Sequence, residues 1–427
     1  MTFTHVNLST VRAWGRTVGY LAATGRAWGF EYDPAWRRSG LDLAPLLMPR
    51  SSRRRVFSFP ALSAETYQGL PPMIADAAPD RFGNGIIDAV LAREGVPPSE
   101  VTALDRLAYV GARGMGALTF EPDVSPAMVP TALEMSRLVE DARAAVQGDL
   151  GGDRVATESL NELIQVGTSA GGARAKAIIA WNPQTDEVRA GGVPVPPGFE
   201  QWLLKFDGVG VDAQLGSTQN YGRTEYAYHL MAVAAGVEMS ECRLLEEGGR
   251  AHFLTRRFDR PGTDGTRVHM QSLCAMAAVD FNAVATNDYA SLFTTAAELG
   301  LNAGEQIFRR MAFNVAASNN DDHSKNHAFL MAEDGTWSLS PAYDVTYAYN
   351  PVSAWTRSHL MSVNGVFDGI GDRELYAVGE RFGVPGYRAI VREVRAVVRR
   401  WPEFAAAAGL PEDREREIGT RLSELAA

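Results

Sequence analysis

The chain is poor in cysteine and has no long apolar run. Only Cys242 and Cys274 occur among its 427 residues, and they do not form a CxxC pair. Disulfide scaffolds need several cysteines, so none is expected, and a reducing cytoplasm fits best. No stretch approaches the roughly 20 apolar residues that span a bilayer. The first 20 residues also lack the apolar core of a secretory signal. We therefore expect a cytoplasmic protein without a membrane anchor.

An excess of basic residues is also lacking. The chain has 41 Lys and Arg against 51 Asp and Glu, which gives a formal net charge of -10. Binding to nucleic acid phosphates needs clustered Lys and Arg, so a broad nucleic-acid surface is not expected. Any association with DNA would be indirect, through a partner. The length favours two or three packed units.

The first part of the chain has the pattern of a small α+β unit. Residues 17–21 and 28–32 read as strands, and the aromatic and polar alternation over 28–32 predicts that this strand is half-buried. A helix is predicted over 71–95, after two prolines, and a short strand over 115–121. A further helix is predicted over 130–147, and glycines follow it.

The rest of the chain begins with strands and ends with helices. Residues 177–181 and 201–206 read as apolar strands, and Phe253–Phe258 as another. Helices dominate from residue 268 onward, apart from a hairpin near 327–340. The predicted fold class is therefore α+β.

The strongest chemical signal is a polar octapeptide that runs from Asn319 to Asn326. It follows an amphipathic helix with four apolar residues on one side, Ile307, Phe308, Met311 and Val315. Polar groups at the end of a buried helix are costly unless they bind something. A turn at Asp334-Gly335 predicts a hairpin, which delivers the chain to Asp344.

The order Asp, five residues to Asn, hairpin and second Asp is the order that protein kinases use. In that chemistry Asp321 accepts the hydroxyl proton, while Asn326 and Asp344 supply the hard oxygen ligands that Mg²⁺ prefers. His323 could orient Asp321 or touch phosphate, and Lys325 could neutralise the charge of the transferred group. The alternative for the octapeptide alone is a polar helix cap and turn.

Two further segments fit phosphate binding. The run from Gly167 to Lys176 is rich in small residues, which lets backbone N–H groups approach phosphate oxygens, although it is not a Walker A loop. Lys205 stands inside an apolar strand, where its charge needs a partner. It matches the strand lysine of kinases, and Glu225 could pair with it. The alternatives are a plain glycine-rich turn and a lysine that extends from a sheet edge to water.

Together these segments resemble the HipA family of bacterial toxin kinases. The resemblance covers nearly the whole chain. It rests on Leu104–Leu107, Met115–Leu118, Ser169–Lys176, Lys205, Arg257–Arg260, Asp321–Asn326 and Tyr343-Asp344, together with Ala75–Gly83.

The resemblance implies a two-lobed, protein-kinase-like fold with a mostly helical C-terminal lobe. The small β-rich N-terminal subdomain would span residues 1–125, the kinase N-lobe 126–262 and the C-lobe 263–427. Asp321 would be the general base, helped by His323 and Lys325, and Asn326 and Asp344 would bind magnesium. ATP would be bound by Gly171, Gly172, Ala173, Arg174, Lys176, Lys205, Arg256, Arg257, Phe258, Gln271, His323 and Tyr343.

The resemblance also implies regulation and partners. Family members autophosphorylate a serine of the glycine loop, and Ser169 matches that position. A phosphate there would add nearly two negative charges beside the ATP site, which would inhibit the enzyme. The expected partner is a helix-turn-helix, HipB-like antitoxin that contacts operator DNA. Known family targets include aminoacyl-tRNA synthetases. Arg256 departs from the family, because it stands where the best-known member has an acidic hinge residue.

Two other functions compete with this prediction. Asp321, Asp322, His323 and His327 form a dense cluster that could bind two metals in a phosphoesterase, which would need no nucleotide. A catalytically silent, kinase-like scaffold that binds an antitoxin repressor is the non-enzymatic alternative.

Overall fold

The computed structural model describes residues 3–25, 27–125, 133–147, 163, 175–191, 195–209 and 220–426. The chain divides into two compact units. The first takes in Met1–Gln219, Leu245–Gln271 and Leu330–Thr336, and the second Asn220–Leu244, Ser272–Phe329 and Trp337–Ala427. Among the described residues, no helix combines the length and the apolar character needed to cross a membrane.

The first unit opens with a five-stranded sheet in the order β4-β3-β2-β1-β5. Its strands are β1 (Leu8–Ala13), β2 (Arg16–Thr24), β3 (Ala27–Tyr32), β4 (Val56–Phe57) and β5 (Leu118–Glu121). The predicted strands at 17–21 and 28–32 lie within β2 and β3. Strand β5 returns from far along the chain to pair with β1, with Val11 opposite Phe120. This pairing joins the start and the end of the segment Leu8–Glu121 in one sheet.

Five α-helices lie between β3 and β5 along the chain. They are α1 (Pro34–Arg38), α2 (Ala64–Tyr67), α3 (Pro72–Ala75), α4 (Arg81–Arg93) and α5 (Ala103–Val110). The prediction of one helix over 71–95 was wrong in its continuity. The chain leaves the helix after α3, and Asp80 restarts it by accepting a hydrogen bond from the Gly83 N–H at 2.7 Å, as an N-cap does.

The second five-stranded sheet has the order β7-β6-β8-β10-β9, and all of it except the first half of β9 belongs to this unit. Its strands are β6 (Lys176–Asn182), β7 (Glu187–Ala190), β8 (Glu200–Lys205), β9 (Cys242–Glu247) and β10 (Arg250–Arg256). The predicted strands 177–181 and 201–206 correspond to β6 and β8. Helices α4 and α6 (Met135–Gln147) cover one face, where Ile86 and Leu138 pack with Ile179, Trp202 and Leu204. The chain then runs into β11 (His269–Ser272).

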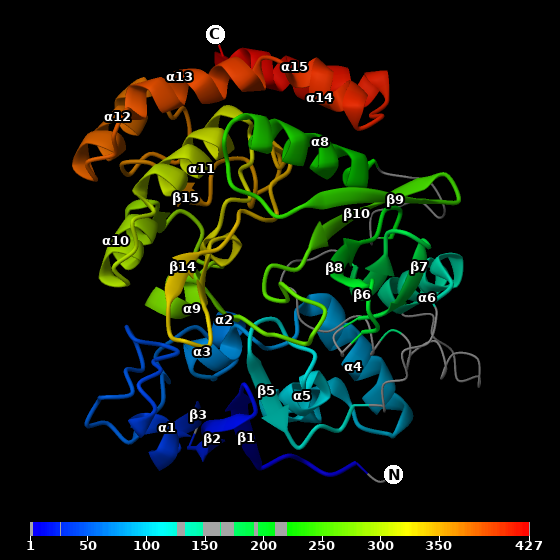
Figure 1. Cartoon of the computed structure of the whole chain (residues 1–427), viewed down its shortest axis with the longest axis vertical. Helices are drawn as coiled ribbons and strands as arrows, with labels where there is room; N and C mark the ends of the chain where they lie inside the picture. Colours follow the sequence, from blue (N-terminus) through cyan, green and yellow to red (C-terminus); the bar gives the residue numbers. More distant parts are fainter. Residues whose placement is uncertain are drawn as a thin grey trace. The chain divides into compact units, whose positions relative to one another are not determined.

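The second unit is mostly helical (Figure 1). Its longer helices are α8 (Tyr221–Ala234), α10 (Ala290–Glu298), α11 (Gly304–Ala316), α12 (Asp372–Arg381), α13 (Tyr387–Val398), α14 (Trp401–Ala407) and α15 (Glu412–Ala426). Helix α11 packs against α10 and α13, and α14 packs against α8. The four apolar residues predicted to share one side of α11 are all buried. The predicted α+β class, β-rich first and mostly helical later, is confirmed.

Candidate active site

The polar octapeptide leaves the buried end of α11 as predicted. Ser318, which follows the C-cap residue Ala317, has a left-handed backbone with φ 51°, and a 3-10 turn follows at Ser324–Asn326. The hydroxyl of Tyr228, on α8, donates to the carbonyl of Ala317 at 2.6 Å. Because the helix end is held in this way, the loop starts from a fixed point.

Asp322 anchors the loop. Its carboxylate is completely buried and accepts hydrogen bonds from the Tyr289 hydroxyl at 2.8 Å and the Leu360 N–H at 2.8 Å. It also lies 2.9 Å from Nδ1 of His359. Asn314 and Asn319 extend the network, since each donates a side-chain hydrogen bond within it. With its oxygens used in this way, Asp322 is a structural group. Sequence reasoning offered it only as a metal ligand.

Asp321 is the more open of the two neighbouring carboxylates, with 36% of its side chain exposed. Its Oδ1 accepts a hydrogen bond from the indole N–H of Trp355 at 2.7 Å. Burial raises the pKa of Asp321 above its ordinary value, and the charge of Asp344 adds to the rise, while His323 and the Trp355 bond oppose it. A carboxylate with a raised pKa is better able to take up a proton.

His323 lies beside this carboxylate, and Lys325 shares the Phe281 ring with His323. Nε2 of His323 is 3.7 Å from Oδ1 of Asp321. The imidazole ring stands between Phe281 and Trp355, at ring-centre distances of 5.3 Å and 6.1 Å. The ammonium group of Lys325 lies 5.3 Å from the centre of the Phe281 ring. The structure therefore brings His323 to Asp321, and it links Lys325 to them through Phe281.

Asn326 and Asp344, the predicted metal ligands, line one small cavity together with Asn319, Asp322 and His327. The Asn326 side chain donates to the carbonyl of Asp321 at 2.8 Å, which leaves its amide oxygen for other partners. Asp344 has φ 57°, a left-handed conformation that non-glycine residues rarely adopt and that clusters at functional sites. One amide and one carboxylate oxygen form a donor set that suits Mg²⁺.

A hairpin of β13 (Ala328–Met331) and β14 (Trp337–Leu339) separates the loop from Asp344, as predicted. The Ser340 N–H donates to the carbonyl of Ala328 at 2.9 Å. Beyond it, the hydroxyl of Tyr343 donates to the carbonyl of Lys325 at 2.7 Å. This bond ties the approach to Asp344 directly to the loop.

In the first unit two lysines stand side by side. Lys176 on β6 is the direct cross-strand partner of Lys205 on the neighbouring strand β8, and both are almost fully buried. Strand β8 lies inside the sheet, so the alternative of an edge lysine reaching water is wrong. The Lys176 ammonium pairs with Asp80 at 3.3 Å, and that of Lys205 lies 5.8 Å from the centre of the Phe253 ring. Both lysines stay predicted phosphate ligands, and Lys176 already has a carboxylate partner.

The predicted hinge residues begin with Arg256, the last residue of β10, and continue beyond the strand. Arg256 pairs with Glu200 at 3.2 Å. The guanidinium of Arg257 is buried and donates to both oxygens of Asp259, at 2.9 Å and 2.7 Å. Because that side chain is used internally, any contact of Arg257 with a nucleotide would come from its main chain. Phe258 is half-buried.

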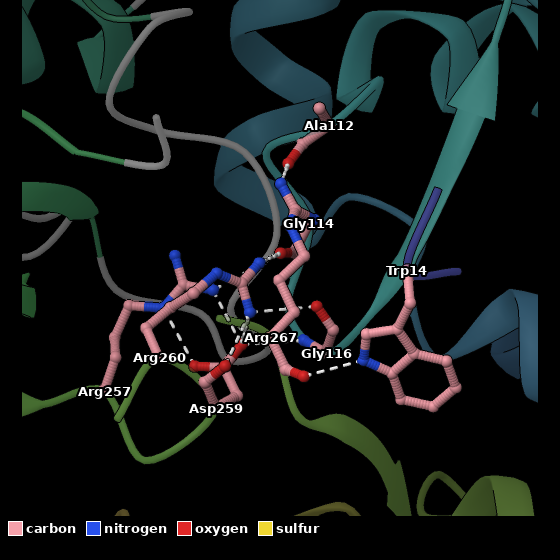
Figure 2. A network of polar contacts seen from close by, with 8 residues as sticks. All are labelled: Trp14, Ala112, Gly114, Gly116, Arg257, Asp259, Arg260 and Arg267. Atoms are coloured by element: carbon pink, nitrogen blue, oxygen red, sulfur yellow. Dashed lines mark hydrogen bonds and ion pairs between the residues drawn. The ribbon is translucent and has the colours of Figure 1, made fainter. Parts of the chain in front are cut away.

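Figure 2 shows how this hinge segment is fixed within the first unit. Arg260 donates to Asp259 at 2.8 Å and to the carbonyl groups of Gly114 and Gly116, at 3.0 Å and 2.9 Å. The Gly116 N–H donates to Asp259 at 2.7 Å. The Arg257–Arg260 segment is therefore bound to the loop before β5.

The remaining predicted residues fall into two groups. Gln271 is buried and donates to the carbonyl of Leu43 at 2.9 Å, while Glu225 is buried on α8 of the second unit. Both stay predictions. The others lie outside the described residues: Ser169, Gly171, Gly172, Ala173 and Arg174.

The phosphoesterase alternative finds little support in this geometry. Its cluster needs Asp322, whose oxygens are used by structural hydrogen bonds. In the part of the chain that the structure describes, no group of three or more His, Cys, Asp and Glu side chains is arranged to hold a metal ion.

Two family models match the chain. Residues 9–121 match the HipA N-terminal domain, and residues 168–401 match the HipA-like C-terminal domain. The chain belongs to the HipA family. The predicted resemblance is thereby confirmed over most of the sequence.

One solved structure has a similar fold over nearly the whole chain. The HipA-fold chain is similar to a chain of the Shewanella oneidensis MR-1 toxin-antitoxin complex of HipA, HipB and operator DNA. The TM-score is 0.67 and the identity 16%, covering 98% of this chain and 95% of that one. The Helicobacter pylori proinflammatory kinase CtkA aligns with a TM-score of 0.32 and 11% identity, over 53% of this chain and 92% of its own. A search of curated proteins gave no match.

Proposed function

We propose that this HipA-family chain is an ATP- and magnesium-dependent serine/threonine protein kinase. The observation that carries the proposal is Asp321. Its carboxylate is fixed through one oxygen, partly open to solvent and raised in pKa. The loop that holds it also carries Asn326, which lines a cavity with Asp344.

In this mechanism Asp321 takes the proton of an acceptor hydroxyl, while the oxygen of that hydroxyl attacks the γ-phosphorus of ATP. The O–H bond breaks, a new P–O bond forms, and the bond to the ADP oxygen breaks. Lys205 would neutralise phosphate charge, and Lys325 would do the same for the transferred group. Magnesium, held by Asn326 and Asp344, would supply further charge neutralisation.

We propose further that the kinase is the toxin of a toxin-antitoxin pair. The similar Shewanella protein is part of a complex with HipB and operator DNA. A helix-turn-helix antitoxin would accordingly be the partner, with DNA contacted only through it. The acceptor would be a protein, and aminoacyl-tRNA synthetases are the class that the family suggests. Ser169 would be the site of inhibitory autophosphorylation.

Intact-mass spectrometry after incubation with ATP and Mg²⁺ tests the activity, with Asp321→Asn as the matched inactive variant. A gain of one phosphate in the wild type alone, mapped to Ser169, is expected. No gain in the wild type, combined with no ATP binding by calorimetry, would favour the silent scaffold. Phosphate at sites other than Ser169 would reject the autophosphorylation site but keep the kinase.

A further inference from the structure

The contact between Trp355 and Asp321 was not foreseen from the sequence. The indole N–H of Trp355 donates to Oδ1 of Asp321 at 2.7 Å, a short distance for an N–H donor. An indole N–H only donates and cannot accept a proton, so it does not compete for the proton that a general base must take. The bond can therefore orient the carboxylate without acting in proton transfer.

The two oxygens of Asp321 are placed differently. Oδ1 faces the Trp355 indole and is 3.7 Å from the His323 ring. Among the described residues, no hydrogen bond reaches Oδ2, and 36% of the side chain is exposed. Oδ2 is therefore the oxygen left to accept the proton of a substrate hydroxyl, because Oδ1 is already held.

The segment that carries Trp355 is hydrogen-bonded to the loop residues on both sides of Asp321. The Ser353 hydroxyl oxygen accepts hydrogen bonds from the Trp355 N–H at 3.2 Å and the Thr356 N–H at 3.3 Å, which closes a turn. The Asn320 side chain donates to the carbonyl of Thr356 at 3.0 Å, and Asp322 accepts from Leu360 N–H. These bonds fix the indole relative to the residues immediately before and after Asp321.

We propose that Trp355 is a positioning residue for the general base. Its N–H holds Oδ1 of Asp321 and so directs Oδ2 toward the acceptor hydroxyl. This inference rests on the proposed kinase function. The competing role is a gate, in which the Trp355 segment blocks the carboxylate and must leave before phosphoryl transfer.

The test removes the hydrogen bond and keeps the ring. In the full chain, Trp355 is replaced by 3-benzothienylalanine, whose sulfur stands where the indole N–H was, and separately by phenylalanine. The rate of phosphate incorporation at saturating ATP and Mg²⁺ is measured by intact mass. Hydrogen bonds to charged groups are strong enough that we expect a loss of about ten- to hundredfold.

Three controls separate positioning from general damage. The dissociation constant of ATP should stay within about twofold of the wild type, because the bond acts on the acceptor side. Trp28→Phe, on β3 of the first unit, should leave the rate unchanged. In the Asp321→Asn background the Trp355 substitution should cost nothing further, since the two residues act as one unit.

The outcomes are distinguishable. An unchanged rate in the benzothienyl variant would overturn the positioning role, and a faster rate would establish the gate instead. If Trp355→Phe loses both rate and thermal stability, the isosteric variant decides. A wild type that incorporates no phosphate and binds no ATP would reject the kinase proposal itself, and this inference with it.

Discussion

Asp259 and Asp321 are both acidic side chains set into protein, yet their surroundings are opposite. Asp259 is completely buried, and although burial disfavours its charge, Arg257 and Arg260 outweigh that effect and hold its pKa well below the ordinary value. Asp321 has no arginine partner among the described residues, keeps an exposed edge and has a raised pKa. The first is a brace that stays ionised, and the second is poised to take a proton. Burial raises the pKa of both carboxylates, so it is the neighbouring arginines of Asp259 that make the two pKa shifts opposite in direction.

The largest effect is expected from substitutions in the candidate active site, at Asp321 and Asp344. Asp321→Asn and Asp344→Asn should each lower the rate of phosphoryl transfer, and loss of a general base typically costs about 10²–10⁴-fold. Quench-flow or mass measurements with ATP and Mg²⁺ would check this. Asp334→Asn, in the exposed hairpin turn, is the matched control and should keep full activity. Normal activity in both variants would refute the site.

Substitution of Asp259, the structural carboxylate, should lower the stability of the fold. Asp259→Asn leaves two buried guanidinium groups without their carboxylate, so the free energy of unfolding should fall by about 3–5 kcal/mol. Asp321→Asn removes a charge that burial disfavours and should leave stability equal or higher. Urea denaturation of both variants would measure the contrast. If Asp321→Asn proved the more damaging of the two, the comparison would be wrong.

Substitution of Lys176 tests whether this residue is structural, like Asp259, or takes part in the chemistry, like Asp321. Its ammonium pairs with buried Asp80, so Lys176→Met should destabilise the fold by about 3 kcal/mol. Pairing it with Asp80→Asn should recover most of that loss, because no uncompensated charge remains and asparagine can still cap α4. Thermal unfolding of the single and double variants would report it. A weaker ATP affinity in the double variant, with stability restored, would show that Lys176 also binds phosphate.

Two buried histidines give the smallest predicted effect, a dependence of stability on pH. Burial lowers the pKa of His269 and of His327 from 6.5 to about 4. Between those pH values the unfolded chain binds protons that the folded chain does not. Stability should therefore fall as pH decreases through this window, by about 1–2 kcal/mol per histidine near pH 5. Unfolding midpoints at pH 7 and pH 5 would measure it, and His269→Gln with His327→Gln should flatten the dependence.

In the second unit, spacing along the chain predicted the candidate site residues themselves. It did not predict the residues that hold them in place. Asp321, Asn326 and Asp344 stand at fixed distances in the sequence, and a hairpin with Gly335 at φ 92° separates them, so local rules were enough. Trp355 and His359 have no such spacing relative to Asp321. They reach the loop only because the chain folds back, which a single sequence does not encode in any local pattern.

The same limit applies to the fold. Strands β2, β3, β6 and β8 were predictable because alternation or apolar runs mark them directly. The break between α3 and α4 was missed, although Pro79-Asp80 is a plausible stop and N-cap. The pairing of β5 with β1, and of Lys176 with Asp80, joins residues about a hundred positions apart. Only tertiary contact decides such pairs.

The hydrogen bonds from Arg260 to the Gly114 and Gly116 carbonyl groups have a consequence for how this protein can be divided. The two family regions, 9–121 and 168–401, look like separable modules in the sequence. Yet the acceptors for a buried guanidinium of the later region belong to the earlier one. A gene cut between them would yield a C-terminal fragment with orphaned cationic donors and poor solubility. Recombination that exchanged one region alone would succeed only if the incoming loop restored both carbonyl positions.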